Sequence, residues 1–139
     1  MKSFIYMASF LLSVYMAIVF SSCSKDGNDE PAPLPYIVVE QSHYNVSAEA
    51  QTIEVHVRTN IDLEPVADQN GDKQSWISIS NSPQHTDDML TYKVMINNNT
   101  GGVQREGYVY FEPAPGISIP KDADIGNKAI IIEQAAANP

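Results

Sequence analysis

Hydrophobic and polar side chains alternate with a period of two along most of the chain after residue 35. In segment 52–58, one face carries Ile53, Val55 and Val57, while the residues between them are polar or charged. Alternation of this kind is typical of a β-strand with one buried face. The same pattern predicts strands at 92–96, 107–111 and 130–134, and shorter β-prone runs predict strands at 36–40, 43–47, 61–66 and 76–80.

Turn-forming residues separate these runs, with Asn70-Gly71, Ser82-Pro83, the polar segment 97–102 and the proline-rich segment 113–116 as the clearest signals. No segment of this part of the chain has an amphipathic helical pattern. The sequence therefore predicts an all-β fold, an immunoglobulin-like two-sheet antiparallel sandwich of seven to eight strands. Because the chain has a single cysteine, a disulfide between the two sheets is excluded.

The N-terminal segment follows a different pattern. Lys2 precedes an apolar run from Phe4 to Phe20, which ends in Ser21-Ser22-Cys23. A basic residue, an apolar stretch and small residues in this order are typical of a bacterial signal peptide. The alternative is an uncleaved anchor helix, since the run is just long enough to span a bilayer. The lone cysteine at the cleavage position favours removal of residues 1–22.

Segment 20–23 resembles the lipobox of bacterial lipoproteins, with Phe20 at the position where leucine is usual. The resemblance implies that Cys23 becomes an acylated N-terminus and that its acyl chains anchor the protein in a membrane. Residues 23–35 are first acidic and then proline-rich, which predicts a flexible linker. The acidic residues after Cys23 also resemble surface-export signals of Bacteroidota lipoproteins. We therefore expect a lipid-anchored protein of the bacterial outer membrane, on its periplasmic or cell-surface side.

Five short motifs follow one another in the predicted sandwich: Arg58-Thr59-Asn60, Ser75-Trp76-Ile77-Ser78-Ile79-Ser80, Ile96-Asn97-Asn98-Asn99-Thr100-Gly101, Arg105-Glu106-Gly107-Tyr108-Val109-Tyr110-Phe111 and Ile132-Glu133-Gln134-Ala135. Their order resembles the BACON domain of Bacteroidota. The resemblance covers 34–136, so we assign 36–136 to a BACON domain and 137–139 to a tail. It also implies that Trp76 and Ile77 anchor the core, with the Trp76 indole largely buried. The segment 113–127 is longer than the usual hairpin of the family.

Charge and composition exclude several classes of chemistry. The formal net charge is −9 and the basic residues are scattered singly, so we expect no nucleic-acid partner. His43, His56 and His85 lie far apart in sequence without a cysteine partner, and the aspartate-rich segments 68–72 and 122–127 do not complete a calcium-binding loop. We expect no metal and no cofactor. The adjacent acids Asp87 and Asp88 do not define the opposed carboxylate pair of a glycosidase, and we expect no enzymatic activity.

Tyr108 and Tyr110 are the strongest candidates for a binding site. They are two residues apart on a predicted strand and therefore share a face, opposite Val109 and Phe111, which we assign to the core. If the tyrosine face is open to solvent, the two rings form a platform for a sugar. The alternative is that they cover the outer face of a sheet and pair with cross-strand neighbours.

These observations predict a non-catalytic, membrane-tethered lipoprotein with one BACON domain. It would act as a spacer or protein-docking module in a cell-envelope system for glycan utilisation, and its partner would be a polysaccharide or a glycan-processing or transport protein. The alternative function is direct carbohydrate binding through the exposed tyrosines.

Overall fold

The computed structural model describes residues 30–69 and 72–138. The predicted signal peptide, Cys23 and the first part of the linker lie outside this range. The chain divides into two units, Met1–Ala32 and Pro33–Pro139, and the description below concerns the second. Within the described ranges, no helix has the length and apolar character needed to cross a membrane.

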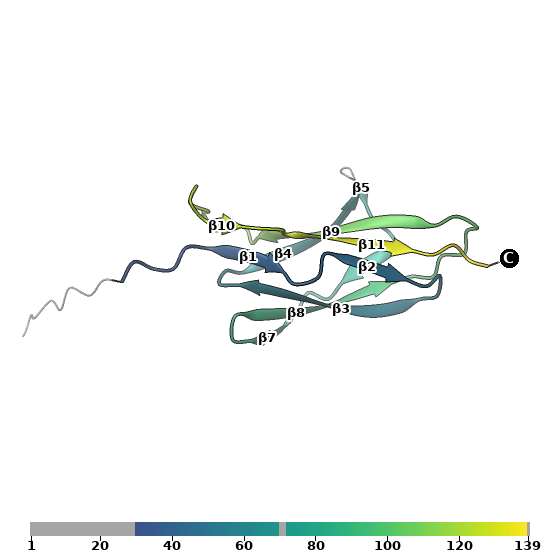
Figure 1. Cartoon of the computed structure of the whole chain (residues 1–139), viewed down its shortest axis with the longest axis horizontal. Helices are drawn as coiled ribbons and strands as arrows, with labels where there is room; N and C mark the ends of the chain where they lie inside the picture. Colours follow the sequence, from purple (N-terminus) through teal and green to yellow (C-terminus); the bar gives the residue numbers. More distant parts are fainter. Residues whose placement is uncertain (1–29, 70–71, 139) are drawn as a thin grey trace, which may run out of the picture. The chain divides into compact units, whose positions relative to one another are not determined.

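The second unit consists of two β-sheets (Figure 1). The first sheet has the strand order β10 (Asp124–Ile125), β1 (Tyr36–Val39), β3 (Gln51–Thr59), β8 (Met89–Ile96) and β6 (Ile77–Ile79), and β7 (Gln84–Thr86) also pairs with β8. The second sheet has the order β2 (His43–Val46), β11 (Ala129–Gln134), β9 (Arg105–Pro113), β4 (Leu63–Gln69) and β5 (Asp72–Lys73). The prediction of an all-β, two-sheet architecture is confirmed for the described residues.

The number of strands is higher than the seven to eight expected. Each of the eight predicted segments contains a strand, but β5, β7 and β10 are additional. These three have only two or three residues each. None of them lies within a longer β-prone run, such as the run 76–80 that contains the three-residue β6, so the sequence pattern does not reveal them.

The sandwich is also not wholly antiparallel as expected. β1 runs parallel to β10, and β2 runs parallel to β11. β1 and β2 follow each other in the chain, yet β1 pairs in the first sheet and β2 in the second. The chain thus changes sheets at residues 40–42. A period of two reports which face is buried, and it contains no information on the direction of the neighbouring strand.

The two sheets enclose one hydrophobic core. Its buried side chains come from alternate positions of the strands: Ile37, Val39, Val55, Val57, Ile77, Leu90, Tyr92, Val94, Ile96, Val109, Phe111, Ile130 and Ile132. The rings of Tyr92 on β8 and Phe111 on β9 meet across the two sheets, with centroids 5.2 Å apart and planes inclined at 48°. Such tilted aromatic pairs add packing energy beyond the area that they bury. This contact joins the sheets at the centre of a sandwich without a disulfide.

Candidate functional site

The outer face of the second sheet carries the two tyrosines singled out by the sequence. Tyr108 and Tyr110 lie on β9 and alternate with buried Gly107, Val109 and Phe111. Their rings are nearly parallel, at 15°, with centroids 6.3 Å apart. Both side chains are partly buried. The structure therefore brings the predicted pair together on the face opposite the core.

The neighbouring strands supply apolar and acidic residues to the same face. Tyr108 lies opposite Asp68 of β4 and Ile131 of β11, and Tyr110 lies opposite Val66 of β4 and Ala129 of β11. The Tyr108 hydroxyl donates a short hydrogen bond to Glu106 Oε1. This bond to a carboxylate is the main reason why the pKa of Tyr108 is raised above its ordinary value, because the neutral hydroxyl donates the bond and ionisation would remove it.

An ion pair and a histidine–carboxylate contact lie on the strands around the tyrosines. Lys128 Nζ donates to Glu112 Oε2 at 2.6 Å, and His43 Nε2 lies 3.4 Å from Glu133 Oε1. Parallel rings on such a face present partly exposed π-surfaces beside polar groups, a combination that suits the flat side of a sugar ring. The rings also lie opposite hydrophobic neighbours across the sheet, so the geometry is equally that of a stabilising aromatic cover.

Trp76, which we expected to be largely buried, is only partly buried. Its ring packs against the core, and the Arg105 guanidinium covers it at 4.3 Å from the ring centroid. Arg105 is held in place by bonds from Nε to Gln134 Oε1 at 2.9 Å and from Nη2 to the backbone oxygens of Asn97 and Asn98. The other residues assigned to the core, Ile77, Val109 and Phe111, are buried.

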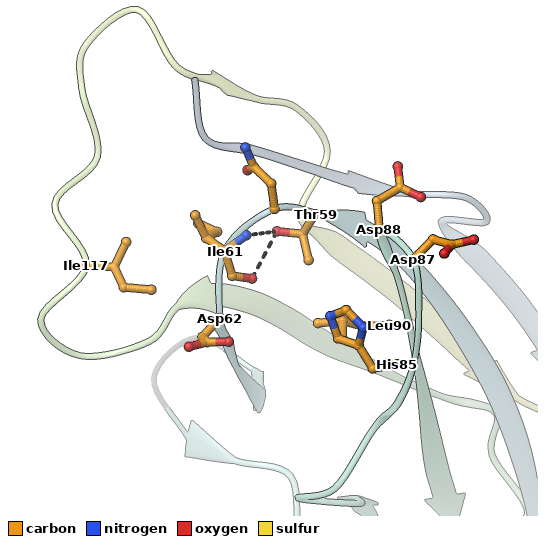
Figure 2. Close-up of a pocket in the computed structure, with 9 residues that line it drawn as sticks. Thr59, Ile61, Asp62, His85, Asp87, Asp88, Leu90 and Ile117 are labelled. Carbon is orange, nitrogen blue, oxygen red and sulfur yellow. Dashed lines mark hydrogen bonds between the residues drawn. The ribbon is translucent and has the colours of Figure 1, made fainter. Parts of the chain in front are cut away.

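A second candidate lies at one end of the sandwich and was not identified from the sequence. Three chain segments far apart in sequence line a cleft of about 570 Å³, which we call the loop-end cleft (Figure 2). Its lining residues are Thr59, Asn60, Ile61, Asp62, His85, Asp87, Asp88, Leu90 and Ile117. They belong to the connection between β3 and β4, to β7 with the start of β8, and to the long segment after β9.

Local backbone structure fixes the walls of the loop-end cleft. The Thr59 hydroxyl donates to the Ile61 carbonyl and accepts from the Ile61 N–H, both at 3.2 Å, and so closes a tight turn. Asp87 has a φ of 51°, a left-handed conformation that aspartate adopts more readily than most residues. The Asp88 carbonyl accepts from the Thr59 N–H at 2.9 Å, which joins two of the three segments.

The start of the sandwich is attached beside this cleft. The Tyr36 N–H donates to Asn60 Oδ1 at 3.0 Å, and Asn60 Nδ2 donates to the Leu34 carbonyl at 3.1 Å. The Tyr36 hydroxyl donates to Asp88 Oδ2 at 3.0 Å. Partial burial, together with this hydrogen bond, raises the pKa of Tyr36. The chain therefore enters the sandwich at the end that carries the loop-end cleft.

The remaining chemistry-bearing residues lie apart. His43, His56 and His85 belong to β2, β3 and β7 respectively, and His56 Nδ1 pairs with the Thr91 hydroxyl at 3.0 Å. Within the part of the chain that the structure describes, no three His, Cys, Asp or Glu side chains form a group that could hold a metal ion. Residues 70–71 of one aspartate-rich segment are outside that part.

Comparison with known proteins bears on the fold. No protein-family model matches the chain, and no curated protein matches it in sequence. Among solved structures, a GH5 xyloglucanase of Bacteroides ovatus in complex with a XXXG heptasaccharide is similar with a TM-score of 0.52 and 14% identity. The match covers 73% of this chain but only 19% of the xyloglucanase chain. At this identity, the similarity describes a shared β-fold.

A chimeric titin Z1Z2, functionalised with an exogenous KLER peptide from decorin, is similar with a TM-score of 0.42 and 14% identity. This match covers 71% of the chain and 91% of the titin chain.

Proposed function

We propose that this chain is a non-catalytic, membrane-tethered lipoprotein whose single BACON-type sandwich acts as a spacer or protein-docking module in a cell-envelope system for glycan utilisation. The observation that carries the proposal is the position of Cys23, the only cysteine, directly after a charged, apolar and small-residue segment. Acylation would tether the N-terminus to the outer membrane, and the linker 23–35 would hold the sandwich away from it.

Strand order supports the choice of domain. Within the two sheets, the spatial strand orders β1-β3-β8-β6 and β11-β9-β4 correspond to the orders A-B-E-D and G-F-C of the strands in immunoglobulin sandwiches. We therefore propose an immunoglobulin-like topology, to which β2, β5, β7 and β10 add short edge strands. The resemblance to a part of a xyloglucanase is in keeping with a module from a glycan-utilisation system.

Acylation of Cys23 can be tested directly. Cells expressing the full chain are fed an alkyne-labelled fatty acid, and the protein is assayed for label and for sedimentation with membranes. Cys23→Ala should lose both, whereas Ser24→Ala, a change of similar size at the next residue, should retain both. A Cys23→Ala protein that still takes up the fatty acid would refute the tether.

The parallel tyrosine rings support a second candidate function, direct carbohydrate binding. Tyr108 and Tyr110 place two nearly parallel, partly exposed rings on one face of β9, and a sugar could pack against them there. The acidic groups around them, Glu106 and Glu112, would accept hydrogen bonds from sugar hydroxyls.

Titration of the full chain in a nonionic detergent against plant and host polysaccharides tests this candidate. Binding should disappear in the double variant Tyr108→Ala with Tyr110→Ala. Met95→Ala, which removes an exposed hydrophobic side chain from the first sheet, should leave it unchanged. Binding that survives the double tyrosine change, or its complete absence in the unmodified chain, would exclude the tyrosine face as a glycan site.

A further inference from the structure

The loop-end cleft has the size and composition of a binding site. Its volume of about 570 Å³ lies within the usual range for ligand pockets, roughly 300–1,000 Å³. Its lining is contributed by three separate connections at one end of the sandwich. Loops clustered at an end of a two-sheet sandwich are the usual place for its recognition sites, because a rigid scaffold holds them while their sequences vary.

The floor of the loop-end cleft is apolar. Leu90 is only 6% exposed, and Ile61 and Ile117, which also line the cleft, are partly buried. Figure 2 shows the Ile117 side chain reaching from the long segment after β9 towards Ile61 and Asp62. An apolar floor of this kind packs against methylene groups and contributes attraction that does not depend on charge.

The rim of the same cleft is acidic. Asp62, Asp87 and Asp88 are exposed there, and none of the nine described lining residues is a lysine or arginine. Asp62 lies on the opposite side of the cleft from Asp87 and Asp88 (Figure 2). A metal ion needs oxygen atoms that converge on one point, whereas carboxylates spread around an apolar floor suit a longer organic cation.

We infer that the loop-end cleft binds a lysine or arginine side chain presented by a partner protein. The methylene stem of such a side chain would pack on Leu90, Ile61 and Ile117, and its charged head would lie among the rim carboxylates. This inference rests on the proposed docking function and names the surface that would perform it. Charge complementarity favours a positively charged occupant, because the rim is acidic and the whole chain has a formal net charge of −9.

The test uses the full chain, labelled with ¹⁵N, in a nonionic detergent. The probes are short Gly/Ser peptides whose central residue is lysine, arginine or the uncharged norleucine. Lysine and arginine peptides should shift the amide resonances of Ile61, Leu90 and Ile117, and should bind more tightly than the norleucine peptide. Added salt should weaken this binding, since the rim charges are exposed.

Variants separate the cleft from general charge attraction. The triple change Asp62→Asn, Asp87→Asn and Asp88→Asn should weaken lysine-peptide binding roughly tenfold, because it removes all three negative charges from the exposed rim. Asparagine keeps the acceptor for Tyr36 and tolerates the left-handed backbone at position 87. Glu54→Gln, a change of an exposed acid on β3 outside the cleft, should leave the affinity unchanged.

Several results would overturn the inference. Equal affinity for lysine and norleucine peptides would show that the carboxylates play no part, and equal weakening by Glu54→Gln would reveal non-specific attraction. Absence of binding, or binding of a free alkyl diamine as tight as that of the lysine peptide, would exclude a site for a partner's side chain. None of these results affects the acylation of Cys23, which the fatty-acid experiment decides separately.

Discussion

Gly107 is a position of close approach between the second sheet and the segment that leads into β6. A Cβ atom at this position would lie 2.6 Å from both Trp76 Cζ2 and Ile77 Cδ1. The Trp76 ring has little freedom to move, because the Arg105 guanidinium covers it and is itself held by three hydrogen bonds. Gly107→Ala should therefore overpack the core and lower the free energy of unfolding by about 1–3 kcal/mol, measured by urea denaturation.

Gly102→Ala is the matched control for this change. A Cβ at Gly102 would meet no atom within 4 Å. Its effect on stability should be small, within about 0.5 kcal/mol. Similar losses for the two variants would show that the contact with Trp76 does not restrict position 107.

Gln134, at the end of β11, connects several segments through its side chain. Its side chain is fully buried, and Nε2 donates to the backbone oxygens of Ala48, Glu49 and Asn97 at 3.0–3.4 Å. Its Oε1 accepts from Arg105 Nε. Gln134→Leu would remove all of these hydrogen bonds, including the one from the charged Arg105, so the free energy of unfolding should fall by roughly 2 kcal/mol.

The exposed Gln104 provides the comparison for Gln134. Its Nε2 makes one long bond of 3.4 Å to Glu133, and Gln104→Leu should change the urea midpoint little. If Gln134→Leu were equally mild, water would have to replace the lost bonds, and the buried network would not be a determinant of stability.

At the scale of the element, strand β8 of the first sheet contributes the buried side chain of Tyr92 to the core. This side chain is 1% exposed, and burial, with a smaller contribution from the nearby Asp62 carboxylate, raises its pKa to about 12. An unfolded tyrosine has a pKa of about 10, so the folded state binds the proton more tightly. The resulting stability is complete below pH 10 and is lost as the pH rises towards 12.

Urea denaturation at pH 9 and pH 11 measures this loss. The unmodified chain should lose about 1 kcal/mol more between these values than Tyr92→Phe, which keeps the ring but cannot ionise. The comparison is needed because the pKa values of Tyr36, Tyr44 and Tyr108 are also raised. An identical pH dependence in both proteins would show that Tyr92 ionises as freely in the folded state as in the unfolded one.

The clearest predictions from the sequence are the strands that are long enough to show alternation. β3, β8, β9 and β11 each have six or more residues, and their buried positions follow the period of two. The same alternation places Tyr108 and Tyr110 on one face, so this candidate site is visible in the sequence. β7 and β10 are short pairings that depend on neighbours brought together by the fold, and no local pattern reports them.

The loop-end cleft was missed for a related reason. Its acids Asp87 and Asp88 stand out in the sequence, but their distance from Asp62 and Ile117 is set by the order of strands in the two sheets. Alternation identifies strands without giving this order. A site built on one strand can thus be predicted from residue spacing, whereas a site built from three connections requires the tertiary structure.

At the scale of the whole molecule, the proposed tether and the proposed docking site share an end of the sandwich. Leu34 and Tyr36 are bonded to Asn60, and Tyr36 is also bonded to Asp88, which lines the loop-end cleft. If the protein is tethered as proposed, a partner has to reach the cleft from the end at which Leu34 and Tyr36 lie. Fully extended, the proposed linker 23–35 could span roughly 40 Å, which is comparable to the width of a small folded domain.

Shortening the linker should consequently block large partners while sparing small ones. Deletion of residues 28–33 would halve the reach to roughly 20 Å. On vesicles of neutral phosphatidylcholine, the acylated deletion variant should bind a free lysine peptide as tightly as the unmodified protein does. It should bind the same peptide severalfold more weakly when the peptide is fused to a folded carrier protein, because the bilayer then obstructs the carrier. Fluorescence anisotropy of the labelled probes measures both affinities.

Replacing residues 28–33 by six Gly and Ser residues separates the effect of the linker's length from the effect of its amino-acid composition. It preserves the reach of the linker and should restore binding of the fused probe, since a Gly/Ser chain of equal length spans a similar distance. Weak binding by this variant would mean that residues 28–33 themselves contact the partner. Undiminished binding of the fused probe by the deletion variant would place the docking surface away from the tethered end, because only a site close to the bilayer depends on the length of the linker.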